Sequence, residues 1–299
     1  MKQALKTLYS HLPLKRELFT VLRSVYSPPK SVYQHLHFRG PFTVPMGERK
    51  FLIHHYGTNV ENILFWEGLS ETSPAVGSDW EGVSLALWMK LCQKSRFVLD
   101  VGANTGVFSL IAKTMNPAAE VHAFEPVTRV YERLCANNKL NGFDIHCVEK
   151  ALSNFDGQAE VYDTFDEHTY SVTVNKNLHD PWIKTRKVII KTVRLDTYLE
   201  ALGGNPKIDL IKLDVETHEP EVLEGMGPYL MHSRPPMLVE VLSDEIAARV
   251  EELVKDLGYL YFNISEVGKP RHQKHLSKSD HFNFLLCDQS RAAELGLET

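Results

Sequence analysis

The residues with the clearest chemical pattern lie in a loop that follows an apolar, strand-like run. The run from Phe97 ends in Asp100-Val101, and Gly102-Ala-Asn-Thr-Gly106 follows it directly. Glycine at the end of a strand lets the backbone approach a ligand closely. An acidic residue about 20 positions further on can bind the hydroxyls of a ribose, and Glu125, which ends the next strand-like run, fits that role. The pattern therefore indicates a site for a cofactor that contains adenosine.

The spacing of the glycines favours one such cofactor over another. Dinucleotide-binding enzymes use Gly-x-Gly-x-x-Gly, because a pyrophosphate must rest on the N-terminus of the following helix. Here Asn104 stands in the place of the middle glycine, and Asp100 precedes the loop. A carboxylate repels a phosphate but attracts ammonium and sulfonium groups. The residues therefore favour S-adenosylmethionine over NAD.

The composition of the whole chain narrows the class of protein. Hydrophobic residues make up 43% of the 299 residues and charged residues 24%, as in ordinary globular proteins. The net charge of −5 gives no reason to expect nucleic acid as a partner. The four cysteines are scattered without a Cys-x-x-Cys pair, so neither a zinc site nor a disulfide framework is expected, and a cytoplasmic setting fits best.

The chain divides into an expected N-terminal extension, residues 1–92, and a catalytic domain, residues 93–299. The basic, amphipathic segment 1–27 is expected to be helical and to pack on the protein itself, although contact with an anionic membrane surface or a partner is an alternative. A β-hairpin over 40–46 and 50–56 and helices over 59–69 and 82–92 should follow. We expect this extension to be a lid over the catalytic sheet or an interface, including that of a homodimer.

From residue 96 onwards strands and helices alternate, which predicts a parallel sheet. Helices are expected over 106–115, 128–140, 220–225 and 243–258. An additional strand pair is expected at 157–163 and 187–194, and a terminal antiparallel pair at 259–264 and 281–287. The expected strands of the parallel sheet are 97–101, 120–124, 144–149, 208–213 and 237–241.

Four motifs together resemble the FkbM family of S-adenosylmethionine-dependent methyltransferases. They are Asp100-Val-Gly-Ala-Asn-Thr-Gly106, Phe124-Glu-Pro126, Val193-Arg-Leu-Asp-Thr-Tyr-Leu199 and Ile208-Asp-Leu-Ile-Lys-Leu-Asp-Val-Glu-Thr-His-Glu219. The resemblance covers about residues 95–287 and implies an α/β fold, the Rossmann-like seven-stranded class I methyltransferase sheet whose last strand is antiparallel. It also implies O-methylation of hydroxyls on sugars or polyketide natural products. Thr217 stands where the family usually has glycine, and a positive φ there would strain its β-branched side chain.

Methyl transfer to a hydroxyl requires a bound cofactor, an aligned acceptor and a group that accepts the proton. We expect His218 to be the general base, with a neighbouring carboxylate that orients it and raises its pKa, and Asp214 to position the acceptor or the cofactor's ammonium. Helix capping is the alternative role of His218. The residues expected to contact the cofactor are Asp100, Gly102, Ala103, Asn104, Gly106, Glu125, Pro126, Ala151, Leu152, Ser153 and Asp214.

Several alternatives stay open at this point. Asp214 and Glu240 could hold Mg²⁺, but carboxylates at strand ends are common and no metal is expected. The insertion 164–186, with His168, Tyr170, His179 and Trp182, could stack on a sugar, and the basic loop 266–280 could hold a phosphate. The acceptor is expected to be a hydroxyl-bearing small molecule or glycan. N-methylation of an amino sugar or peptide, a non-catalytic cofactor-binding scaffold and an NAD-dependent oxidoreductase are the competing functions.

Overall fold

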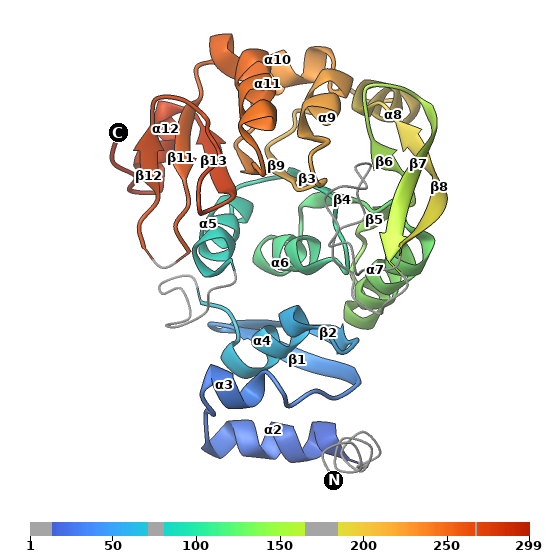
Figure 1. Cartoon of the computed structure of the whole chain (residues 1–299), viewed down its shortest axis with the longest axis vertical. Coiled ribbons are helices and arrows are strands. Elements are labelled where there is room, and N and C mark those ends of the chain that lie inside the picture. Colours follow the sequence, from blue (N-terminus) through green and yellow to red (C-terminus); the bar gives the residue numbers. More distant parts are fainter. Residues whose placement is uncertain (1–13, 71–80, 165–184, 267) are drawn as a thin grey trace.

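The main sheet of this computed structural model contains eight strands among the described residues (Figure 1). The described residues are 14–70, 81–164, 185–266 and 268–299. The order of the eight strands across the sheet is β12-β11-β13-β10-β9-β3-β4-β5. The bounds are β3 Phe97–Val101, β4 Glu120–Phe124, β5 His146–Val148, β9 Leu210–Leu213, β10 Met237–Glu240, β11 Leu260–Asn263, β12 Arg271–Gln273 and β13 Asn283–Cys287.

The directions of these strands confirm the predicted sheet. Strands β5, β4, β3, β9 and β10 pair in parallel, whereas β13 is antiparallel to both β10 and β11. Seven strands thus follow the class I methyltransferase order. The eighth, β12, pairs with β11 at the edge and lies in the segment that was expected to be a basic loop. Its residues Arg271-His-Gln273 carry no apolar alternation, so the sequence gives no strand signal there.

Helices cover both faces of the main sheet (Figure 1). Successive residues of a strand point to opposite faces of the sheet, so Val98 packs in the hydrophobic core on one face and Leu99 in the core on the other. On one face lie α5 (Gly82–Cys92), α6 (Val107–Met115), α7 (Thr128–Asn141) and α12 (Gln289–Glu294), and on the other α8 (Leu195–Ala201), α9 (Glu219–Gly225), α10 (Pro228–Ser233) and α11 (Asp244–Val254), which η2 (Lys255–Leu257) extends.

The N-terminal elements form the lower part of Figure 1. The predicted hairpin is confirmed as β1 (Gly40–Met46) and β2 (Arg49–His55), and helices α2 (Lys15–Val25), α3 (Lys30–Tyr33) and α4 (Asn59–Glu67) pack beside it. The Asn141 side chain on α7 accepts from the backbone N–H of Leu52 at 2.7 Å and donates to its carbonyl at 2.7 Å. One hydrophobic core runs from Phe19 to Ala292, so these elements share their packing with the catalytic sheet.

Helix α2 is the described part of the predicted basic segment, whose residues 1–13 lie outside the described residues. Phe19 is buried, whereas Leu18, Val21 and Val25 are exposed. Among the residues that the structure describes, no helix is long and apolar enough to cross a bilayer.

A separate three-stranded sheet of order β6-β8-β7 stands beside the main sheet. The predicted additional pair is confirmed as β7 (Gly157–Thr164) and β8 (Thr185–Val193), which run antiparallel, and β6 (Ala151–Leu152) adds to β8 in parallel. The stretch with His168, Tyr170, His179 and Trp182 lies outside the described residues.

The turn after β3 depends on Gly102. This residue has φ +80°, and a Cβ atom there would overlap the backbone carbonyl oxygen of Asp214. We expect Gly102→Ala to lower the free energy of unfolding by about 2–4 kcal/mol, because it adds backbone strain and forces two strand ends apart. Urea denaturation measures the loss.

Gly142→Ala is the matched control, since Gly142 has φ +64° but open space around the position of a Cβ atom. It should cost only about 1 kcal/mol, the price of the left-handed conformation. Equal losses in the two variants would contradict the close approach between Gly102 and Asp214.

Candidate active site

A cavity of about 790 Å³ opens at the carboxyl ends of the central strands. Gly102, Glu125, Asp214 and Glu240, which end or directly follow β3, β4, β9 and β10, line it. The strand order reverses between β3 and β9, and open α/β sheets bind ligands at such a reversal. Glu81 and other residues of the N-terminal part also line the cavity, so that part covers one side of it.

The glycine loop is fixed to the neighbouring strand. The backbone N–H groups of Gly102 and Ala103 both donate to the carbonyl of Phe124, at 3.1 and 2.9 Å. Gly102, Ala103 and Asn104 line the cavity, while their contact with a cofactor stays a prediction. Gly106 is not among the described lining residues. Its φ is +93°, and a Cβ atom there would press on Leu134 of α7, so Gly106 permits helix packing.

Glu125 is held rigidly at the cavity wall. One carboxylate oxygen accepts from the backbone N–H of Asn104 at 3.1 Å, and the other accepts from that of Val127 at 3.0 Å. The residue is 7% exposed, and this burial raises the pKa of its carboxyl to about 7. Pro126 lines the cavity beside it. A carboxylate fixed in this way is suited to receive hydrogen bonds from the two hydroxyls of a ribose.

Asp100 lies behind the cavity and is not among the described residues that line it. Its carboxylate accepts from the Ser109 hydroxyl at 2.5 Å, and burial raises the pKa of the Asp100 carboxyl to about 6. Asp100 thus ties the end of β3 to the first turn of α6. A direct contact between Asp100 and a cofactor remains a prediction.

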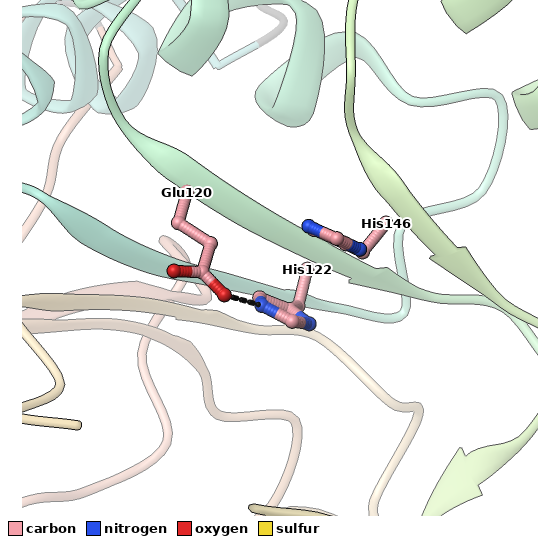
Figure 2. Close-up of side chains that lie close together, drawn as sticks. All are labelled: Glu120, His122 and His146. Carbon is pink, nitrogen blue, oxygen red and sulfur yellow. Dashed lines mark hydrogen bonds and ion pairs between the residues drawn. The ribbon is translucent and has the colours of Figure 1, made fainter. Parts of the chain in front are cut away.

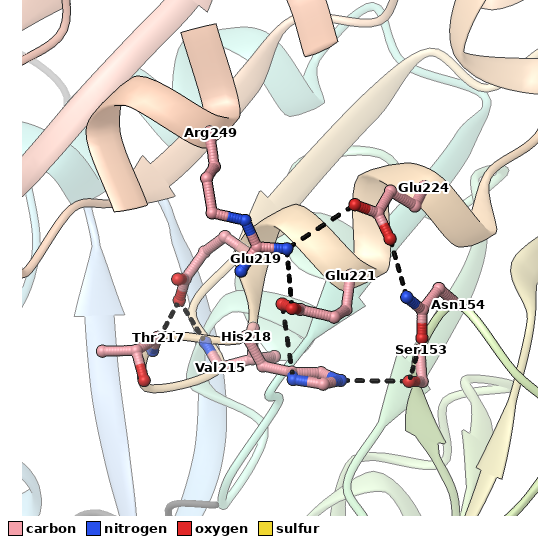
Figure 3. Close-up of polar contacts among 9 residues, drawn as sticks. All are labelled: Ser153, Asn154, Val215, Thr217, His218, Glu219, Glu221, Glu224 and Arg249. Carbon is pink, nitrogen blue, oxygen red and sulfur yellow. Dashed lines mark hydrogen bonds and ion pairs between the residues drawn. The ribbon is translucent and has the colours of Figure 1, made fainter. Parts of the chain in front are cut away.

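Of the three residues predicted to flank the adenine, two line the cavity and one does not. Ala151 and Leu152 line the cavity, whereas Ser153 lies behind it and is fully buried. The Ser153 hydroxyl is 3.0 Å from Nε2 of His218 (Figure 3). Ser153 therefore connects the adenine side of the cavity to the residue expected to be the base.

His218 lines the cavity, but both of its ring nitrogens have protein partners (Figure 3). Nε2 faces Ser153, and Nδ1 lies 3.5 Å from one carboxylate oxygen of Glu221, whose other oxygen accepts from Arg249 at 2.7 Å. A carboxylate thus lies beside the ring, while its orienting role stays a prediction. The predicted rise in pKa is wrong, because desolvation outweighs the attraction of Glu221 and lowers the pKa of His218.

The turn that carries His218 is strained. Glu216 has φ +54° and Thr217 has φ +79°, so the position where the family usually has glycine does adopt the left-handed conformation. A carboxylate oxygen of Glu219 accepts from the backbone N–H groups of Val215 and Thr217, at 3.2 and 3.3 Å (Figure 3). This fully buried side chain holds the turn in place.

Lys212 is the buried cation of the site, which the sequence reading missed. Its Nζ donates to Asp214 at 2.8 Å and lies 4.8 Å from the Phe108 ring centroid. Burial alone would lower the pKa of Lys212, but Asp214 and Glu81 raise it overall. A lysine inside the apolar run Leu210-Ile-Lys-Leu213 is the signal that could have revealed it.

The sequence analysis did not predict Glu81 and Glu216 as site residues, and it considered Glu240 only as a possible metal ligand. Burial raises the pKa of Glu81 and of Glu216 to about 7 and that of Glu240 to about 10. Asp214 contributes to each rise, so these carboxyls crowd one another. Asp214, one of the two carboxylates considered as Mg²⁺ ligands, is already paired with the buried ammonium of Lys212.

The cavity is strongly acidic. Among the described residues that line it, one lysine, Lys212, faces nine carboxyls: Glu61, Glu81, Glu125, Glu160, Asp214, Glu216, Glu240, Glu266 and Asp280. None of the basic residues of loop 266–280 is among these lining residues. The raised pKa values mean that several of these carboxyls carry a proton near neutral pH, but a bound cation would favour their ionised forms, which a bound anion would not. The arrangement therefore gives the predicted phosphate contact no support.

The strand order, with a cavity where it reverses and a fixed acidic residue after β4, is that of class I methyltransferases. Residues 100–261 match the model of the methyltransferase FkbM domain, and the chain belongs to this family. It is therefore a methyltransferase of a family that uses S-adenosylmethionine.

Two curated relatives carry informative names. Methyltransferase sdnD of Sordaria araneosa is 29% identical over 189 residues, which cover 54% of this chain and 73% of sdnD. Hexuronic acid methyltransferase AglP of Haloferax volcanii is 29% identical over 142 residues, which cover 48% of this chain and 54% of AglP. The match thus spans only about half the length of AglP.

Two solved methyltransferase structures are similar to this chain at lower sequence identity than these relatives. The O-methyltransferase from Bacillus cereus in complex with SAH has a TM-score of 0.40 and 12% identity, covering 71% of this chain and 83% of that one. The methyltransferase FkbM from Methylobacillus flagellatus has a TM-score of 0.37 and 13% identity, covering 64% and 43%.

Glu219 predicts a pH dependence of stability. Burial raises the pKa of its carboxyl from 4.5 to about 8. Between these values the folded protein keeps a proton that the unfolded chain has released, so stability from this group falls as pH rises. Glu219→Gln keeps an oxygen that can accept both backbone N–H bonds but does not titrate. Relative to the unmodified protein, its free energy of unfolding should rise over this range by on the order of a few kcal/mol and then level off.

Chemical denaturation at a series of pH values measures this difference, and Glu252→Gln, an exposed change on α11, is the control. Its difference from the unmodified protein should stay constant with pH. Parallel stability curves for Glu219→Gln and the unmodified protein would show that Glu219 is ionised in the folded state.

Proposed function

We propose that this chain is an S-adenosylmethionine-dependent O-methyltransferase that acts on a hydroxyl of a sugar, glycan or related natural product. The observation that carries the cofactor assignment is the acidic cavity at the strand reversal, with Glu125 fixed by two backbone N–H groups. A sulfonium and an ammonium group suit such a cavity, whereas a pyrophosphate does not. The relative named as a hexuronic acid methyltransferase supports a sugar acceptor.

The residues of the cavity fit the parts of this cofactor. Glu125 would receive the ribose hydroxyls, and Ala151 and Leu152 would flank the adenine. Gly102, Ala103 and Asn104 would contact the amino-acid end, whose ammonium Asp214 would attract. A buried oxygen of Glu240 has no hydrogen-bond partner among the described residues, which leaves a polar atom for a group of the ligand. When bound, the cofactor supplies a methyl group made electrophilic by its sulfonium.

The protein must remove a proton from the acceptor hydroxyl as the new C–O bond forms. We propose His218 for this role, with Glu221 orienting the ring and Ser153 holding Nε2 until an acceptor displaces it. The lowered pKa of His218 keeps the imidazole neutral and able to accept a proton near pH 7. Glu216 is the competing base, because it lines the same cavity and its pKa is raised to about 7.

N-methylation of an amino sugar or peptide is the second candidate function. The excess of carboxyls in the cavity favours it, since a protonated amine would be attracted to the ionised forms of Glu216 and Glu240 and would lower their raised pKa values. We also propose that residues 1–92 act as a cover of the active site, because Thr58, Glu61 and Glu81 line the cavity.

The base can be tested with His218→Ala and Glu216→Gln, assayed by transfer of a labelled methyl group to uronic acids and amino sugars. We expect His218→Ala to lower kcat by about 10²–10⁴-fold and to leave the affinity for S-adenosylhomocysteine unchanged. His232→Ala, an exposed change on α10, is the control and should have full activity.

Undiminished turnover by His218→Ala would remove His218 as the base. A larger loss in Glu216→Gln, with the acidic limb of the pH profile abolished, would assign the role to Glu216. Mass spectrometry of the product separates O-methylation from N-methylation.

A further inference from the structure

A second cluster of ligating side chains lies away from the cavity, at the amino-terminal ends of β4 and β5 (Figure 2). Glu120 is the first residue of β4, and His146 is the first residue of β5. His122 and His146 are directly paired in the parallel register, and Glu120, two residues before His122, projects from the same face. One ligand atom of each residue lies within 4.8 Å of those of the other two.

The partners of His122 favour a metal ligand. Its ring is fully buried, with Nδ1 2.8 Å from the Tyr198 hydroxyl and Nε2 3.0 Å from a carboxylate oxygen of Glu120. A histidine that binds a metal usually donates its second ring N–H to an oxygen, which fixes the tautomer. In the tautomer whose Nδ1–H donates to Tyr198, the lone pair of Nε2 faces the Glu120 carboxylate and is available to a metal ion, whereas in the other tautomer Nε2–H donates to Glu120. Binding of a cation would select the first tautomer.

The two exposed residues can complete a site around His122. The rings of His122 and His146 are stacked with centroids 4.5 Å apart and planes 11° apart. His146 and Glu120 are exposed, so their side chains can rotate, and a tilt of the His146 ring out of the stack would bring its lone pair toward the roughly 3.3 Å ligand separations of tetrahedral zinc. Two imidazoles, one carboxylate and a water form a common zinc-binding set.

We propose that Glu120, His122 and His146 bind one zinc ion, which would join the amino-terminal ends of β4 and β5. This site is separate from the proposed methyl-transfer site, because Glu125 lies at the opposite end of β4, about 17 Å along the strand from Glu120. The ion would therefore stabilise the sheet edge without taking part in catalysis.

Calorimetric titration of the untagged full chain with ZnCl₂ tests the proposal. We expect one zinc ion per chain, with affinity lowered about 100-fold or more in His146→Ala and about 10- to 100-fold in Glu120→Gln and Tyr198→Phe. Both ligand changes are at exposed side chains, so these variants should fold. Binding of Co²⁺, with the visible absorption of a tetrahedral site, gives a second readout.

His275→Ala is the control, because His275 also faces a carboxylate, that of Glu251 at 2.7 Å, but belongs to no three-residue cluster among the described residues. It should bind zinc as the unmodified protein does. Equal zinc affinity in His146→Ala and the unmodified protein, or the absence of a stoichiometric site in the latter, would overturn the proposal. Neither result would bear on the methyltransferase function.

Discussion

The active site depends on the burial of one lysine among carboxyls. Lys212 comes from the middle of β9, where apolar neighbours leave its ammonium no access to water. Asp214 accepts from it directly, and Glu81 and Glu240 act on it electrostatically. Removal of one partner from such a group leaves an uncompensated buried charge, which costs about 3–5 kcal/mol. The lysine thus makes it possible to gather acidic side chains from β9, β10 and the N-terminal part around one cavity.

The same region contains the backbone features that position the ligand-binding residues. The carbonyl of Asp214 approaches Gly102 so closely that only glycine fits, which joins the ends of β3 and β9. Beyond Asp214 the chain makes a left-handed turn at Glu216 and Thr217, and the buried carboxyl of Glu219 satisfies its N–H groups. The strain of two such residues is tolerated because the turn places His218 and Glu216 at the cavity.

The sequence predicted most of the fold because the strands of the main sheet are short apolar runs bounded by turn residues. It missed β12, whose residues are polar, and the short elements β6, α3, α8, α10 and α12, and it placed helix and strand ends only to within a few residues. In the candidate site it found Glu125, Asp214 and His218, which follow strand ends and line the cavity. It did not predict that Gly102 and Leu152 line the cavity whereas Gly106 and Ser153 do not, because a motif does not show which residues face the cavity. Glu81 could not be found at all, since its role arises only when the N-terminal part packs on the sheet.

The central claim is that the acidic cavity binds S-adenosylmethionine through Glu125. Calorimetric titration with S-adenosylmethionine, S-adenosylhomocysteine and NAD, on the unmodified protein and on Glu125→Ala, tests it most directly. We expect both adenosyl ligands to bind and NAD not to bind, with affinity for the two ligands clearly reduced in the variant. Binding of NAD alone, or equal affinity of the variant and the unmodified protein for S-adenosylmethionine, would contradict the claim.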